Sequence, residues 1–188
     1  MALLSLRNWA QINADLEQMK KVLVIGPGGA GKSTLARRLG ERLRIEVKHL
    51  DSVYWRPGWQ EPAKDEWLDT VQELTSEESW IIDGNYGGTL EARVQRCDTI
   101  IFLDLPRLVC LWRIAKRRLL YRGRSRPDMG EGCPEKVDWE FISWVWGYAR
   151  QSRPKVVQLL REHAETKQIV WLRSTAEVEK FLAGDIRG

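Results

Sequence analysis

The sequence has few cysteines and no long uninterrupted apolar run. Its three cysteines, Cys97, Cys110 and Cys133, are an odd number without CxxC spacing, so they support neither a disulfide framework nor a zinc cluster. Residues 1–20 contain apolar side chains, but polar and charged residues interrupt them and no small-residue cleavage site follows. This pattern argues against a signal peptide and a transmembrane span. We therefore expect a cytoplasmic protein that does not contact a membrane.

The overall composition is that of an ordinary globular protein. The 188 residues are 43% hydrophobic and 30% charged, which fits one domain and neither a disordered nor a membrane class. The net charge is only +4, but it is unevenly distributed, because residues 107–126 contain eight Lys or Arg and no Asp or Glu. Such a block predicts a site for anions, either phosphates or nucleic acid.

The first residues are predicted to form an extension, 1–19, before a single domain at 20–188. Apolar side chains recur there at helical spacing, at Leu6, Trp9, Ile12 and Leu16. An amphipathic helix docked on the domain would have this pattern. Met19 stands just before Lys20-Lys21 and the first predicted strand, so a misassigned start of translation is the alternative interpretation of residues 1–18.

Continuous apolar runs alternate with helical patterns along the chain. The runs are 22–25, 80–82, 99–103 and 169–172, with a weaker one at 45–50. The expected helices are 33–43, 64–74, 108–121, 135–149, 154–163 and 175–182. Continuous rather than alternating hydrophobicity is typical of strands covered on both faces. The order predicts an α/β domain with a parallel sheet and right-handed crossovers.

The loop after the first predicted strand has the composition of a phosphate-binding loop. Residues 26–33 read GPGGAGKS and match the pattern GxxxxGK[ST] at every fixed position. Glycines let backbone N–H groups approach phosphates, and the start of the next helix adds partial positive charge. Lys32 is expected to reach the β- and γ-phosphates and Ser33 to ligate Mg²⁺. The predicted nucleotide-binding residues are Gly26, Gly28, Gly29, Ala30, Gly31, Lys32, Ser33 and Thr34.

Longer motifs carry a resemblance to a known family. They read IGPGGAGKSTLARRLG, HLDSVYWRPGW, SWIIDGNYGGTL, TIIFLDLPR, RRLLYRGRSRPDMGEGCPEK and WLRSTAEVEKFL. Over roughly residues 20–183 the chain resembles bacterial topology modulation proteins, which are adenylate-kinase-like P-loop proteins. The resemblance implies a three-layer P-loop NTPase fold of the nucleoside monophosphate kinase type. Such a fold has a five-stranded parallel sheet, helices on both faces and a basic lid, here at about 121–134.

Two acids follow predicted strands. The resemblance implies that Asp83, in an Asp-Gly pair, helps to hold the hydrated Mg²⁺ with Ser33. The next residues are Asn85-Tyr86 where adenylate kinases have Phe-Pro-Arg, a departure that argues against an AMP-type acceptor. Asp51 ends the segment HLD, and either orients and deprotonates an acceptor hydroxyl or is a solvated loop acid.

Arginines in and after the basic block are candidate phosphate ligands. The resemblance places Arg113 near adenine and Arg117 near phosphate, on one face of a helix. Arg122, Arg124 and Arg126 fall in the expected lid, where arginine can neutralise charge on a transferring phosphoryl group.

Two further features each have two interpretations. Arg173 follows the last predicted strand, at the position where related kinases wrap a loop around adenine, but an ordinary helix cap by Ser174 or Thr175 also fits. The predicted helix 135–149 is rich in aromatic residues, which favours a core helix. An aromatic helix beside a basic segment would also suit single-stranded nucleic acid.

These features together predict an ATP- and Mg²⁺-dependent kinase that transfers the γ-phosphoryl group to a small acceptor, such as a nucleotide, nucleoside or metabolite. Its predicted catalytic residues are Lys32, Asp51, Asp83, Arg117, Arg122 and Arg126. The alternative is a nucleotide-dependent DNA-binding protein without kinase activity. The sequence contains no helix-turn-helix, zinc-finger or RRM signature that would favour this alternative.

Overall fold

The computed structural model describes residues 18–121, 128–134 and 137–183. The expected helix within 1–19 lies almost wholly outside the described residues, and so do Arg122, Arg124 and Arg126 of the expected lid. The rest of the chain forms alternating strands and helices.

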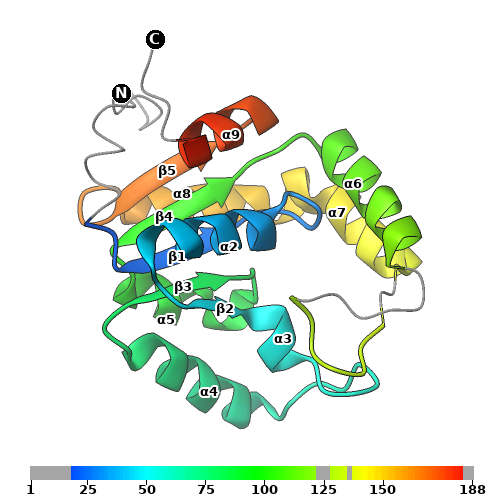
Figure 1. Ribbon diagram of the computed structural model, residues 1–188, viewed down its shortest axis with the longest axis horizontal. Helices are drawn as coiled ribbons and strands as arrows, with labels where there is room; N and C mark the ends of the chain where they lie inside the picture. The colour runs from blue at the N-terminus through cyan, green and yellow to red at the C-terminus, as the bar shows by residue number, and fades with distance from the viewer. Residues whose placement is uncertain (1–17, 122–127, 135–136, 184–188) are drawn as a thin grey trace.

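The centre of the fold is a five-stranded parallel sheet in the order β2-β3-β1-β4-β5 (Figure 1). The strands are β1 (Lys21–Ile25), β2 (Val47–His49), β3 (Trp80–Asp83), β4 (Thr99–Leu103) and β5 (Gln168–Leu172). The side chains of β1, β3 and β4 are almost all buried, because helices cover both faces of the sheet. The predicted parallel sheet of five strands is thereby confirmed.

The helices form the two outer layers. They are α2 (Lys32–Leu43), α3 (Leu50–Tyr54), α4 (Lys64–Ser76), α5 (Gly87–Arg96), α6 (Arg107–Leu120), α7 (Trp139–Gln151), α8 (Arg153–Glu162) and α9 (Thr175–Ala183). Val22 and Val24 of β1 share a core cluster with α2, α6 and α9. Leu23 and Ile25 share the opposite cluster with α4, α5 and α8. Because successive side chains of a strand point to opposite faces, one strand holds both layers together.

Two helices were absent from the sequence prediction. Helix α3 has five residues, too few for a helical period, and it begins at Leu50, inside the run 45–50 that was expected to be a strand. Helix α5 begins with Gly87-Gly88, and the low helix propensity of glycine argues against a helix at this point of the sequence. The predicted start of the aromatic helix at 135 is also wrong. The helix begins at Trp139, because Asp138 is its N-cap: the Asp138 carboxylate accepts a hydrogen bond from the backbone N–H of Phe141 at 2.8 Å.

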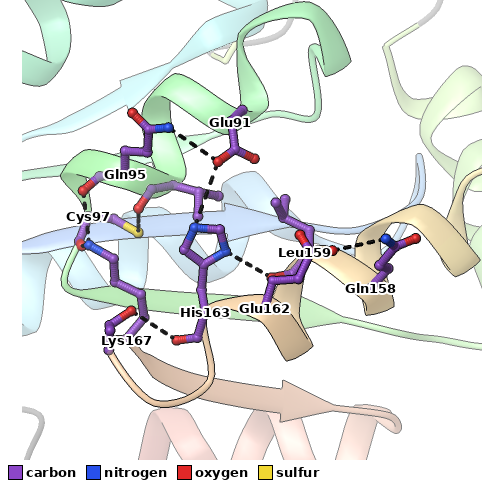
Figure 2. Close-up of polar contacts among 10 residues, drawn as sticks. Glu91, Gln95, Cys97, Gln158, Leu159, Glu162, His163 and Lys167 are labelled. Atoms are coloured by element: carbon purple, nitrogen blue, oxygen red, sulfur yellow. Dashed lines mark hydrogen bonds and ion pairs between the residues drawn. The ribbon is translucent and has the colours of Figure 1, made fainter.

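At the amino ends of the strands, two side chains form hydrogen bonds with backbone groups of neighbouring segments. Asp98 accepts from the N–H groups of Lys20 and Lys21 at 3.0 and 2.6 Å, just before β1. Beyond the end of α5, Lys167 donates to the carbonyls of Gln95 and Cys97 at 2.9 and 2.6 Å, as Figure 2 illustrates. Carbonyls at a helix end lack intrahelical donors, so this lysine caps α5.

None of the helices within the described residues is long and apolar enough to cross a membrane.

Candidate functional site

The loop between β1 and α2 has a backbone that only glycine accommodates. Gly26, Gly29 and Gly31 have φ of 149°, 77° and 96°. A Cβ at Gly26 would lie 2.4 Å from the carbonyl oxygen of Leu103, and one at Gly29 would lie 2.4 Å from that of Cys110. The loop therefore packs directly against the end of β4 and against α6. This geometry fits the close backbone approach that phosphate binding requires.

Lys32 is the first residue of α2, and its side chain folds back over the loop. Its Nζ donates to the carbonyls of Gly26 and Pro27 at 3.0 and 3.1 Å. Burial lowers the pKa of Lys32, and the charges of Asp51 and Asp83 oppose this effect. An anionic phosphate would be a stronger partner for the ammonium group than these two neutral carbonyls.

Asp83 lies at the end of β3 and is held by two neighbours. Ser33 Oγ donates to one carboxylate oxygen at 2.8 Å, and His49 Nδ1 lies 2.5 Å from the other. His49 and Asp83 are register partners on β2 and β3, so the sheet itself brings them together. Burial acts to lower the pKa of His49, but its hydrogen bond to Asp83 and the nearby negative charges outweigh burial and raise it. The sequence did not predict this histidine as a partner of Asp83.

The donor atoms at this point fit magnesium. Ser33 and Asp83 supply a hydroxyl and a carboxylate, and Mg²⁺ prefers such oxygen ligands. Magnesium is usually bound through one or two carboxylates together with waters and substrate phosphates. No group of three or more His, Cys, Asp or Glu side chains with metal-binding geometry occurs in the described part of the chain. The residues therefore suit an ion that arrives with a nucleotide.

Asp51, in α3, is oriented by a tyrosine that sequence reasoning did not assign to the site. The Tyr86 hydroxyl donates to Asp51 Oδ1 at 2.7 Å. Burial raises the pKa of Tyr86, and the negative charge of Asp51 raises it further, so the tyrosine stays a hydrogen-bond donor. Tyr86 itself has φ 33°, which is unusual for a residue with a side chain.

A buried arginine stabilises the turn that carries Tyr86. Arg93 of α5 is fully buried and donates to the carbonyls of Gly84 and Tyr86 at 2.8 and 3.0 Å, and also to that of Asn85. Burial lowers the pKa of Arg93 to about 10. A buried charge must be matched by hydrogen bonds, and here the three carbonyls of one turn provide them. No periodicity or motif in the sequence indicated this role.

Asn85, in the same turn, connects β3 to the phosphate loop. Its Oδ1 accepts from the Gly26 N–H at 3.1 Å and its Nδ2 donates to the Gly26 carbonyl at 2.7 Å. The amide side chain thus satisfies both backbone groups of the first glycine. The residues that follow Asp83 therefore position the loop that begins at Gly26.

The predicted arginine ligands fall in different places. Arg113 of α6 donates to the Ala30 carbonyl at 2.9 Å and to Thr175 Oγ1 at 3.0 Å, so it joins the phosphate loop to α9. Arg117, one turn further along α6, lines a cavity at the carboxyl edge of the sheet. Arg173 is exposed, and its guanidinium lies 4.7 Å from the ring centroid of Trp171 rather than among the described residues that line the cavity.

The start of α9 is an ordinary helix cap. Ser174 Oγ accepts from the N–H of Glu177 at 3.2 Å, and the Glu177 carboxylate accepts from the N–H of Arg173 at 2.8 Å. Ser174 is therefore the N-cap of α9, and Glu177 bonds one residue further out than the glutamate of a standard capping box does. The predicted helix cap is therefore present, and Ser174 provides it.

One cavity of about 1120 Å³ unites these groups at the carboxyl edge of the sheet. Its lining includes Gly28, Gly29, Ala30, Gly31, Lys32, Ser33, Thr34, His49, Asp51, Asp83, Asn85, Tyr86, Arg113 and Arg117. From the aromatic helix α7, Phe141 and Trp144 also line it, whereas Trp139 is 82% exposed. Ligands of α/β proteins bind at this edge, where the strand-to-helix loops converge.

No protein-family model and no curated protein matches this chain. Among solved structures, it is similar to a gluconokinase from Sinorhizobium meliloti 1021, with 16% identity and a TM-score of 0.50, over 88% of this chain and 90% of that one. It also resembles a shikimate kinase from Bacteroides thetaiotaomicron (16% identity, TM-score 0.46, 88% and 95% covered). A third is the deoxyadenosine kinase from M. mycoides (14% identity, TM-score 0.46, 86% and 94% covered). At this identity the likeness shows the fold, which is that of P-loop kinases.

Proposed function

We propose that this protein is an ATP-dependent phosphotransferase that moves the γ-phosphoryl group of Mg-ATP to the hydroxyl of a small acceptor. The observation that carries the proposal is the convergence of three groups on one cavity. These are Lys32 in the phosphate loop, the Ser33–Asp83 pair, and Asp51 with its tyrosine. Phosphoryl transfer needs little covalent chemistry from the protein beyond positioning and charge stabilisation, which these groups can provide.

The donor nucleotide would occupy the loop of residues 26–34. Its backbone N–H groups and the Lys32 ammonium would bind the phosphates, and Ser33 and Asp83 would hold Mg²⁺. The ion, when bound, neutralises charge on the β- and γ-phosphates. Arg113, which bonds to Thr175 at the start of α9, is a proposed nucleotide ligand. Arg173 is a second proposed ligand, and its guanidinium would have to turn from the Trp171 ring toward the nucleotide.

Asp51 is the proposed acceptor-side base. Tyr86 occupies one of its oxygens and fixes the carboxylate, so the other can accept the proton of an acceptor hydroxyl. Arg117, which lines the cavity, and Arg122 and Arg126 of the proposed lid at about 121–134 would stabilise charge on the transferring group. We further propose that residues 20–188 act as one cytoplasmic domain of the topology modulation family, with 1–19 as an extension.

A second candidate function is nucleotide-dependent DNA binding. The observation that favours it is an outer face of α6 and α7 where basic groups lie over exposed indoles. Lys116 lies 5.4 Å from the Trp112 ring centroid and Arg107 lies 3.9 Å from that of Trp146, and the two indoles are 63% and 49% exposed. Aromatic and basic side chains together suit stacked bases. DNA binding that weakens steeply with salt and is lost on Trp112→Ala would favour this candidate.

The deciding experiment measures ADP release from Mg-ATP in the presence of nucleosides, nucleotides, sugars and amino alcohols. Lys32→Ala is the negative control, and Lys116→Ala, which removes a cation outside the cavity, is the matched control. Acceptor-stimulated ADP that disappears only in Lys32→Ala supports the phosphotransferase. Tight ATP binding without stimulated turnover on any acceptor contradicts it.

A further inference from the structure

The cavity has two chemically different walls. The wall formed by the phosphate loop, α2 and α6 carries the basic side chains Lys32, Arg37, Arg38, Arg113 and Arg117. The opposite wall, which we call the α3 wall, is formed by Asp51, Trp55, Trp59, Glu61, Tyr86 and Asp128. In the view of Figure 1, α3 and α9 lie to either side of α2. The nucleotide phosphates and the acceptor would therefore meet different surfaces.

The α3 wall is acidic. Asp51, Glu61 and Asp128 contribute three carboxylates, and the described lining residues of this wall include no lysine or arginine. Arg56 lies close in sequence, but its guanidinium forms an ion pair with Glu66 outside the cavity lining. A phosphate monoester or a carboxylate bound here would face like charges at short range.

The same wall is aromatic. The rings of Trp55 and Trp59 lie 5.3 Å apart between centroids at 64°, and Tyr54 packs against Trp55 at 5.0 Å. Both indoles are half-buried and line the cavity. Indole faces attract C–H groups of sugar rings, flat bases and cations.

Trp59 is held in a conformation that tryptophan rarely adopts. Its φ is 63°, inside a tight turn closed by hydrogen bonds between Arg56 and Gln60 of 3.0 and 3.3 Å. A bulky side chain at positive φ strains the backbone, and the conformation persists only where the surrounding structure holds it in place. Such strained residues are concentrated at ligand sites. The turn therefore presents this indole to the cavity at some cost in backbone energy.

A segment distant in sequence fixes the turn. The Gly58 N–H donates to the Gly132 carbonyl at 3.1 Å, and the buried Cys133 thiol donates to the Arg56 carbonyl at 3.1 Å. A Cβ at Gly130 would lie 2.2 Å from the Trp55 carbonyl oxygen, so the two segments are in direct backbone contact. The α3 wall is thus formed before any acceptor binds, which favours specific recognition.

We propose that the acceptor is an uncharged or cationic alcohol with a ring or flat apolar face that packs on Trp55 and Trp59, and that phosphate monoesters and carboxylates are excluded. This inference rests on the proposed phosphotransferase function. In the reaction, the acceptor oxygen forms a bond to the γ-phosphorus as the bond from that phosphorus to the β,γ-bridging oxygen breaks. The hydroxyl proton passes to Asp51, and ADP leaves with the bond electrons.

The test uses matched acceptors that differ only by a charged group. The phosphate of the charged member is placed away from the primary hydroxyl, so that both members keep it: cytidine and cytidine 3′-monophosphate, glucose and glucose 1-phosphate, and glucosamine and glucosamine 1-phosphate. ADP release with Mg-ATP should favour the neutral or cationic member by at least about 100-fold in kcat/KM. Preference for a phosphorylated or carboxylate acceptor would overturn the inference while the phosphotransferase stands.

Failure of the underlying function has a different signature. Binding of each pair to the protein saturated with a non-hydrolysable ATP analogue is measured by calorimetry. No binding and no stimulated ADP release with any member, although the ATP analogue binds, would refute both the kinase and its acceptor class. Stimulated release with either member keeps the kinase and decides the acceptor class.

Trp59 offers a variant that separates recognition from folding. Trp59→Gly removes the indole and accommodates φ 63°, so it should raise the acceptor KM about tenfold with little change in kcat or in stability. Trp59→Phe should retain most affinity, and Trp139→Ala, which changes an exposed indole outside the cavity, is the matched control. An unchanged KM in Trp59→Gly would contradict acceptor packing on this wall. Glu61→Gln should reduce the discrimination between the two members of each pair.

Discussion

The two edges of the sheet each pair a histidine with a carboxylate, in different surroundings. At the carboxyl edge His49 lies 2.5 Å from Asp83, whose side chain is 5% exposed. At the amino edge His163 lies 3.7 Å from Glu91, whose side chain is 58% exposed (Figure 2). The first pair belongs to a network with Ser33 and lines a cavity, whereas the second links the end of α8 to α5. Under the proposed function, the polar side chains at the carboxyl edge would bind ligand, whereas His163 and Glu91 at the amino edge connect two helices.

The largest contrast is expected in catalysis. Asp83→Asn keeps the shape of the side chain but removes the charge that would hold Mg²⁺, so kcat/KM should fall about 10³-fold. Glu91→Gln at the other edge should leave kcat/KM unchanged. Coupled ADP-release assays on both variants make the comparison. A loss in Glu91→Gln similar to that in Asp83→Asn would contradict the division between the two edges.

The next contrast concerns stability. Arg93→Met would leave three carbonyls of the site turn without their donors, which should lower the free energy of unfolding by about 3 kcal/mol. Lys167→Met removes a cap at the amino edge and should cost only about 1 kcal/mol, because its carbonyls can be hydrated. Urea unfolding monitored by circular dichroism gives both values. Equal losses would show that burial does not distinguish the two sites.

A smaller effect should follow from loss of the Tyr86 hydroxyl. Tyr86→Phe leaves the ring packed but frees Asp51 to rotate, so kcat should fall about tenfold with little change in the free energy of unfolding. The expected signature is a kcat effect at constant nucleotide KM, since the Tyr86 hydroxyl bonds to Asp51 on the proposed acceptor side. A kcat equal to that of the unmodified protein would argue against Asp51 as the base. Tyr148→Phe, which removes a buried tyrosine hydroxyl outside the cavity lining, is the control.

The last contrast is a pH dependence at the amino edge. Burial raises the pKa of Cys97 to about 12 against a usual value of 9.0. In the unfolded chain the thiol ionises first, so the folded state binds the extra proton and stability falls as pH rises from about 9 towards 12, by at most about 1.4 kcal/mol per pH unit. Cys97→Ala should lose the part of the pH dependence of stability that the thiol causes. Urea unfolding of both proteins under reducing conditions between pH 8 and 10.5 measures their free energies of unfolding. The difference between the unmodified protein and Cys97→Ala should narrow with rising pH.

Much of the fold could be predicted from the sequence, because the patterns that indicate it lie in contiguous residues. Buried parallel strands appear as continuous apolar runs, and β1, β3, β4 and β5 lie where such runs predicted them. The phosphate loop was readable for the same reason, since its glycines, Lys32 and Ser33 stand within eight residues. The helices α3 and α5 were missed because one is too short to show a period and the other opens with two glycines.

The partners of the site were not readable, because they are long-range. His49 reaches Asp83 across 34 residues, Asn85 reaches Gly26 across 59, and Asp51 depends on Tyr86 across 35. Each contact exists only because parallel strands bring their carboxyl ends to one edge. The acidic and aromatic α3 wall is a further product of that convergence.

By itself, the sequence determined the α/β class, the strands β1, β3, β4 and β5 and the loop that suits phosphate, since each is encoded in contiguous residues. Tertiary structure alone decided which acid faces which partner, how Arg93 supports the turn after β3, and that basic and acidic walls share one cavity. The physical reason is that burial and charge act between side chains in space. The chain determines those neighbours only once the sheet has assembled.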